Sequence, residues 1–181
     1  PNSRVACETL IKNNTVIVAG EITSKANIDY EAIARKVVKD IGYIEDDLGF
    51  TSSGFVFQNL ISEQSKDIDD GISGDEVLGS GDQGLMFGYA CKETPELMPL
   101  PIALAHKLML KHADVRKNKG LGLRPDAKSQ VSIEYDSNYQ PKRIDSIVLS
   151  TQHSDDLNLE DLREIVKTQI IDSCLPETLL D

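Results

Sequence analysis

Tryptophan is absent from the sequence, aromatic residues make up only 5% of it, and there are three cysteines. The spacing of Cys7, Cys91 and Cys174 matches neither a disulfide framework nor a zinc site, so we expect three reduced thiols. Cys7 and Cys174 stand among apolar residues, and we expect both to be buried as small hydrophobic side chains. These features argue against a disulfide-stabilised fold, a structural zinc site and a catalytic cysteine.

Long apolar runs and a secretory signal are also missing. No stretch approaches the length of a membrane-spanning helix, so we expect a cytoplasmic protein with no membrane partner. Positive charge is scarce, because 19 lysines and arginines face 30 acidic residues and the formal net charge is −11. This charge would repel a phosphate backbone, so we do not expect nucleic acid to bind. A nucleotide is not excluded, because local cations or backbone amides outweigh net charge at short range.

The 181 residues do contain 40% apolar residues, enough to bury a core in one domain or in two small ones. Two runs rich in β-branched residues, 4–12 and 15–23, are predicted to form a hairpin that turns at two asparagines. Apolar residues at helical spacing then predict a helix over residues 30–41, ended by Gly42.

The same strand, strand, helix order returns near the end of the sequence. Strands are predicted over residues 130–136 and 143–151, and a helix over residues 159–170. The apolar positions of the two helices are offset by a constant 129 residues, from Tyr30 to Leu159. An internal repeat and the ordinary order of a two-layer sandwich both explain this pattern. Either way we expect an α+β fold of repeated strand-strand-helix units, with helices layered on mixed or antiparallel sheets.

A third helix is predicted between these units, over residues 99–117, with two prolines in its first turn. We expect it to connect two subdomains and to bury a face formed by Leu104, Leu108 and Ala113. Residues 64–84 are predicted to form a mobile loop, and residues 117–125 a second loop. The histidines have no metal-like spacing, so we expect structural roles for His106, His112 and His153.

A glycine-rich segment, GSGDQGLMFGY over residues 79–89, places Asp82 and Gln83 between glycines. Glycines let the main chain approach a ligand closely, although most glycine-rich turns are only turns. The segment lacks the Lys-Ser/Thr ending of a phosphate-binding P-loop and the spacing of a dinucleotide-binding motif. Its composition leaves a ligand site and a simple turn as open alternatives.

The segment RPDAKSQ, residues 124–130, is predicted to be extended because Pro125 disfavours helical geometry in the residue before it. In an extended chain Asp126 and Lys128 share one face while Ala127 points away. The carboxylate suits ribose hydroxyls and the ammonium suits a phosphate, which together suit a nucleotide. The alternative is an exposed ion pair of little energetic value.

Glu8 and Glu21 lie in the first hairpin among small or apolar neighbours. Carboxylates in such surroundings need a partner, and a cation or a substrate amino group would supply it. Solvent-facing positions in ordinary strand alternation explain them equally well.

The segments GSGDQGLMFGYA, RPDAKSQV, VLSTQHS and VACET followed by GEIT together resemble S-adenosylmethionine synthetase, also called methionine adenosyltransferase. The order and spacing of these motifs match over essentially the whole chain. The resemblance implies that ATP and L-methionine react by attack of the thioether sulfur on the ribose C5′. The tripolyphosphate that leaves is then hydrolysed to diphosphate and phosphate.

The resemblance also implies roles for individual residues. Glu8 matches a potassium ligand, whereas Glu21 and Gln64 match methionine-binding residues. The nucleotide would be bound by Asp126, Ala127, Lys128 and Asp82. No residue is assigned to catalysis with certainty, and Asp82 and Lys128 are the candidates. Mg²⁺ and K⁺ are implied as cofactors, and a homodimer or dimer of dimers with active sites between subunits as the assembly.

The domain organisation implied by the resemblance is a partial N-terminal domain over residues 1–66, a mobile loop and glycine-rich turn over 67–84, and a central domain over 85–181. The intact subunit would have pseudo-threefold symmetry. Lys66 stands where a proline is usual, and the loop that follows looks short and lacks an expected arginine. A GHPDK segment would precede Pro1 and a C-terminal domain would follow residue 181, so we expect the chain alone to be inactive. An inert fragment or a noncatalytic relative of the same fold is the alternative.

Overall fold

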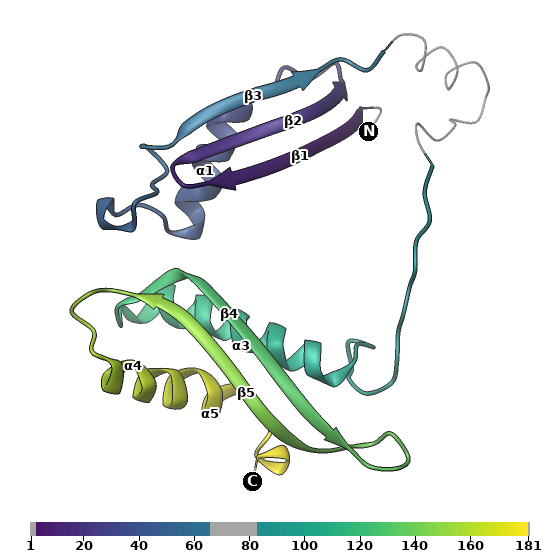
Figure 1. Ribbon diagram of the computed structural model, residues 1–181, viewed down its shortest axis with the longest axis vertical. Helices are drawn as coiled ribbons and strands as arrows, with labels where there is room; N and C mark the ends of the chain where they lie inside the picture. The colour runs from purple at the N-terminus through teal and green to yellow at the C-terminus, as the bar shows by residue number, and fades with distance from the viewer. Residues whose placement is uncertain (1–2, 66–82, 181) are drawn as a thin grey trace. The chain divides into compact units, whose positions relative to one another are not determined.

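The computed structural model describes residues 3–65 and 83–180 and divides into two compact units, 1–86 and 87–181. Each unit packs helices on a sheet, and the two are described separately (Figure 1). The first sheet is mixed and the second antiparallel, so the predicted fold class is confirmed. The domain boundaries expected from the sequence stay a prediction. No helix in the described part of the chain is both long and apolar enough to cross a membrane.

The first unit contains a three-stranded sheet in the order β1-β2-β3 with α1 on one face (Figure 1). Its elements are β1 (Arg4–Lys12), β2 (Thr15–Thr23), α1 (Tyr30–Ile41), the short helix η1 (Asp46–Leu48) and β3 (Val56–Ser62). β2 pairs antiparallel with β1 and parallel with β3. The predicted hairpin and helix are confirmed, and Asn13 takes the left-handed conformation of the turn, with φ of 52°. The sequence reading missed β3.

The core of the first unit is small and centres on Val16, Val38 and Phe55. α1 begins where the Asp29 carboxylate accepts a hydrogen bond from the Ala32 amide and ends at Gly42. The expected apolar face of α1 is buried only in part, because Val38 is 6% exposed whereas three of its apolar residues are at least 41% exposed. These three are Ile33, Val37 and Ile41.

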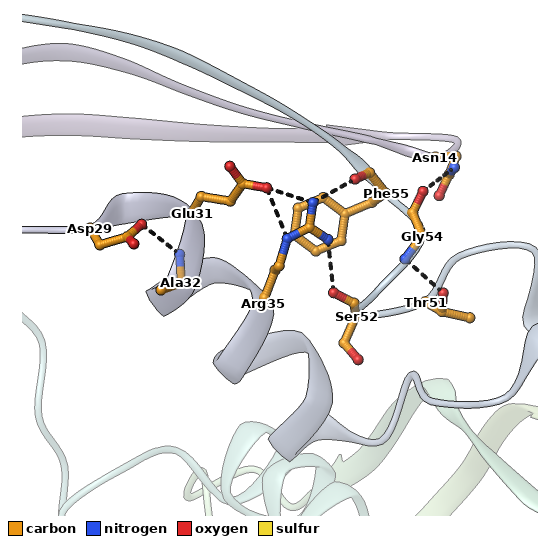
Figure 2. Close-up of polar contacts among 9 residues, drawn as sticks. All are labelled: Asn14, Asp29, Glu31, Ala32, Arg35, Thr51, Ser52, Gly54 and Phe55. Atoms are coloured by element: carbon orange, nitrogen blue, oxygen red, sulfur yellow. Dashed lines mark hydrogen bonds and ion pairs between the residues drawn. The ribbon is translucent and has the colours of Figure 1, made fainter.

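Arg35 joins α1 to the loop that leads into β3 (Figure 2). Its guanidinium donates hydrogen bonds to the carbonyl oxygens of Ser52, at 2.9 Å, and Phe55, at 3.1 Å. It also pairs with Glu31 one turn earlier on the helix and lies 4.4 Å from the centre of the Phe55 ring. The Asn14 side chain donates to the Gly54 carbonyl at 2.9 Å, so the first hairpin is tied to the same loop.

The second unit layers two helical segments on one face of a long antiparallel hairpin (Figure 1). Its elements are α3 (Leu100–Lys119), β4 (Leu123–Tyr135), β5 (Pro141–His153), α4 (Leu159–Ile165), a π-helical turn η2 (Val166–Ile171), α5 (Asp172–Cys174) and η3 (Glu177–Leu179). Leu108, Val115 and Ile170 are fully buried between the layers. This core is larger than that of the first unit.

Three expectations from the sequence are wrong, two of them in this unit and one in the first. α3 does not connect two subdomains but belongs to the core of the second unit, because its buried face packs on β4 and β5. The loop expected over residues 117–125 is reduced to three residues, since α3 continues to Lys119 and β4 begins at Leu123. Cys7 is exposed rather than buried, because β1 is an edge strand with both faces largely open to solvent.

Candidate functional site

Asp126 and Lys128 lie on the face of β4 that points away from α3. Both side chains are exposed, whereas Ala127 between them is half-buried on the helical side. The extended geometry expected from the sequence is therefore confirmed. Neither charged side chain has a hydrogen-bond or ion-pair partner among residues 3–65 and 83–180. The alternative of an exposed ion pair is not what the described structure shows.

The pairing of β4 with β5 is irregular immediately before these residues. Leu123 pairs with His153 and Ala127 with Thr151, so β4 has two more residues than β5 in this interval. A bulge of this kind kinks a strand and redirects its side chains. Regular pairing resumes at Ala127 and continues with Lys128 opposite Ser150. The bulge thus places Asp126 at its end and Lys128 in the regular ladder.

Two hydrogen bonds hold the other face of this hairpin against α3. The Ser129 hydroxyl donates to the Ala105 carbonyl at 2.8 Å, and His112 Nε2 lies 2.7 Å from the Thr151 hydroxyl oxygen. His112 is 3% exposed, and burial, followed by the charge of Arg116, lowers its pKa below the ordinary value. The structural role expected for His112 fits these contacts, although its partner was not predictable from the sequence.

In the first unit, Glu8 and Glu21 lie on the face of the sheet opposite α1. Glu8 pairs with Ala19, and Glu21 pairs with Ala6, so the two carboxylates are diagonal neighbours across the β1–β2 pair. Val16 and Val18 alternate with these positions and are buried toward the helix. Both glutamates are exposed, as expected for ordinary strand alternation. Neither carboxylate has a partner in the described part of the chain.

Gln64 lies just beyond the end of β3. Ser62 is the register partner of Glu21 on β3, and half-buried Gln64 follows two residues beyond it. Glu8 and Glu21 therefore share one face of the sheet, and Gln64 lies two residues past the end of β3. Asp82, the remaining predicted site residue, lies outside the described residues.

Gly20, next to Glu21, lets β1 and β2 approach at this point. Its φ is +136°, and a Cβ there would lie 2.1 Å from the carbonyl oxygen of Ala6. No side chain fits without displacement of the backbone, so glycine is required by geometry.

The described side chains do not assemble a metal centre. Among residues 3–65 and 83–180, no group of three or more His, Cys, Asp or Glu could hold a metal ion. Glu8 and Glu21 supply carboxylate oxygens, which suit hard cations, but Mg²⁺ and K⁺ need more oxygen ligands than two side chains provide. The described residues thus do not fit either ion by themselves.

A structural contact not expected from the sequence is made by Glu93, which lies before α3. Its carboxylate accepts hydrogen bonds from the Leu100 amide at 2.9 Å and from the Tyr135 hydroxyl at 2.7 Å. The Leu100 amide contributes most to lowering the Glu93 pKa, followed by Tyr135. These contacts join the start of α3 to the end of β4. Glu93 is seven residues from Leu100 and 42 from Tyr135, so no local sequence signal marked these contacts.

Two family descriptions match the sequence. Residues 1–66 match "S-adenosylmethionine synthetase, N-terminal domain", and residues 77–181 match "S-adenosylmethionine synthetase, central domain". The matches follow one another in the chain and together account for most of its length. The protein therefore belongs to the S-adenosylmethionine synthetase (methionine adenosyltransferase) family, and its 181 residues hold the N-terminal and central domains.

Proposed function

We propose that the protein acts as an S-adenosylmethionine synthetase, which forms S-adenosyl-L-methionine, phosphate and diphosphate from ATP, L-methionine and water. Family membership supports this proposal. The observation that carries it is that each unit exposes unpartnered charged side chains on the sheet face away from its helices. These are Glu8 and Glu21 in the first unit and Asp126 and Lys128 in the second.

We assign the nucleotide to the Asp126–Lys128 segment. The carboxylate can accept hydrogen bonds from ribose hydroxyls, and the ammonium can meet a phosphate as a point charge. Because neither group is neutralised within the described structure, no internal ion pair has to be broken before a ligand binds. Ala127 faces the helix and would contribute through its main chain.

We assign methionine to Glu21 and Gln64. An amino acid carries an ammonium that a carboxylate attracts, and the Gln64 amide can both donate and accept hydrogen bonds. Glu8, the diagonal neighbour of Glu21, adds a second negative charge to the same face. Two nearby carboxylates repel each other, so a bound cation relieves the repulsion. This accounts for Glu8 as a ligand of K⁺ next to the methionine site.

The reaction needs no nucleophile from the protein. The methionine sulfur forms a bond to C5′ as the bond from C5′ to the triphosphate oxygen breaks, and tripolyphosphate leaves with the bonding electrons. Water then cleaves tripolyphosphate to phosphate and diphosphate. Alignment of sulfur with C5′ lowers the barrier. We assign the binding of methionine to Glu21 and that of ATP to Asp126 and Lys128. No step is assigned to Mg²⁺ or K⁺, and Asp82 stays a candidate ligand of ATP.

The assembly follows from the same proposal. We propose a homodimer or a dimer of dimers, in which a second copy completes each active site. Light scattering coupled to size exclusion would measure the mass of the assembly, and a monomeric active enzyme would contradict this part of the proposal.

The test compares Lys128→Ala with Lys117→Ala in the full-length protein, assayed with ATP, methionine, Mg²⁺ and K⁺. Lys117 is also an exposed lysine of the second unit, but it lies at the end of α3. We expect Lys128→Ala to lower formation of S-adenosylmethionine by about 10²-fold, because a charge-assisted contact is lost, and Lys117→Ala to leave it unchanged. Equal effects would refute the site. A parent protein that binds neither ATP nor methionine would favour a noncatalytic relative.

A further inference from the structure

We propose that His112 is a positioning residue for nucleotide binding, which acts through Thr151 to hold the Asp126–Lys128 segment of β4 in place. This inference rests on the proposed function, because it concerns the segment assigned to ATP. His112 itself is buried on the opposite side of the hairpin and does not reach the nucleotide face.

The hydrogen-bond pattern fixes how His112 and Thr151 interact. The Thr151 hydroxyl donates its single proton to the Gln152 carbonyl at 3.0 Å. With that proton engaged, the hydroxyl accepts at the second contact, and we assign the Nε2 proton to His112 across the 2.7 Å separation. Its buried position, where an imidazolium would be costly, favours the neutral imidazole protonated at Nε2.

The position of Thr151 in the ladder makes this contact important for β4. Thr151 pairs with Ala127, the first regular pair after the bulge. A bulge leaves the local path of a strand underdetermined by ladder hydrogen bonds, and two strands alone make a marginal sheet. Because His112 anchors Thr151 to α3, it also fixes Ala127 and with it the directions of the side chains on either side.

A second hydrogen bond also attaches this part of the hairpin to α3. The Ser129 hydroxyl donates to the Ala105 carbonyl, two residues beyond Ala127 on the same face of β4. Lys128 thus lies between two positions, Ala127 and Ser129, that are held to the helix by hydrogen bonds on opposite strands. A displacement of about 1 Å at a substrate-positioning group is enough to impair a site, so small shifts of this segment would be visible in ATP use.

The test uses substitutions that remove one or both partners in the full-length protein. Thr151→Val leaves the buried Nε2 proton without an acceptor, whereas His112→Met combined with Thr151→Val removes both polar partners. His112→Gln keeps a donor near the position of Nε2. Thr94→Val is the control, because it removes another buried threonine hydroxyl in the same unit, bonded to Met98 and remote from Ala127.

We expect Thr151→Val to raise the KM for ATP about three- to tenfold and to leave the KM for methionine within about twofold. His112→Gln, which keeps a donor, should leave the KM for ATP within about twofold of the parent. The double variant lacks the anchor as well, so it should keep the raised KM for ATP while its melting temperature recovers relative to Thr151→Val. Thr94→Val should lower the melting temperature without changing either KM.

An unchanged KM for ATP in Thr151→Val, or equal increases of both KM values, would overturn the inference, as would a double variant whose KM for ATP returns to the parent value. A parent protein without activity would overturn the proposed function and this inference together. An active parent with an unaffected Thr151→Val variant would overturn this inference alone.

Discussion

Glu8 on β1 and Glu21 on β2 are diagonal neighbours on the sheet face opposite α1, and no described residue neutralises either carboxylate. Diagonal neighbours in an antiparallel pair are about 7–8 Å apart, close enough for like charges to repel. A protein that places two such charges together without a cation loses some stability. Ordinary strand alternation accounts for their exposure, and binding of a cation or of a substrate ammonium stays a prediction for this pair.

We predict that Glu21→Gln raises the KM for methionine by about tenfold or more, because the amide cannot pair with the substrate ammonium. The melting temperature should stay equal or rise slightly, since the repulsion with Glu8 is removed. Activity assays and thermal melts of the same preparations would check both results. Asp46→Asn, at an exposed carboxylate elsewhere in the first unit, serves as the control. A Glu21→Gln variant that melts early and keeps its methionine KM would contradict the assignment.

Glycine at position 20 gives a prediction about stability. Replacement by alanine forces a Cβ into the space occupied by the Ala6 carbonyl, 2.1 Å away, at a φ of +136°. We expect a loss of about 2 kcal/mol or more in the free energy of unfolding of the first unit, measured by urea denaturation. Gly49→Ala isolates the conformational part, because Gly49 also has a positive φ but has no atom within 4 Å of the added methyl. If Gly20→Ala lost no more unfolding free energy than Gly49→Ala, about 1 kcal/mol, then β1 and β2 would be able to move apart at Gly20 at little energetic cost.

The hairpin and the helix of the first unit were predictable because each has a strong local signal. Alternating β-branched residues, two asparagines at the turn and a glycine after the helix all act within a few residues. β3 was missed because its sequence, VFQNLIS, does not alternate apolar and polar residues as a half-buried strand does. Its hydrogen bonds to β2 come from more than 30 residues away and leave no local pattern.

The site was partly predictable for the same reason. The common face of Asp126 and Lys128 follows from the two-residue period of a strand. The shared face of Glu8 and Glu21 depends on the register of β1 and β2, and that register is a tertiary property. The contact of His112 with Thr151 joins residues 39 apart in the chain, so spacing could not reveal it.

Arg35 provides a test of how α1 is attached to the sheet. We predict that Arg35→Met lowers the free energy of unfolding of the first unit by about 1–3 kcal/mol, because two carbonyl contacts and the stacking on Phe55 are lost. Arg35→Lys should recover little, since an ammonium cannot reproduce the planar fork. Lys36 is the next residue after Arg35 on α1 and forms an exposed ion pair with Asp40. Lys36→Met should change the free energy of unfolding by less than about 0.5 kcal/mol. Equal losses from the Arg35 and Lys36 variants would show that the carbonyl contacts contribute little.

The hydrogen bond between Tyr135 and Glu93 predicts a pH dependence of stability in the second unit. Burial, followed by the hydrogen bond to Glu93 and its charge, raises the pKa of Tyr135 to about 12. The folded state holds the Tyr135 hydroxyl proton more tightly than the unfolded state does. The stabilisation from Tyr135 is therefore complete below the unfolded pKa of about 10 and is lost as the pH rises toward 12. The Glu93 pKa is lowered from 4.5, so its contribution is present above that value and is lost as the pH falls below it.

We therefore expect Tyr135→Phe to lower the melting temperature most between about pH 4.5 and about pH 10. The difference from the parent should shrink as the pH rises above about 10 and as it falls below about 4.5. Tyr139→Phe is the matched control, because the Tyr139 side chain is 83% exposed and should show little difference at any pH. Thermal melts of the three proteins across the pH range would measure the effect. A constant difference at all pH values would mean that Tyr135 stabilises the unit through ring packing, with no contribution from the bond to Glu93.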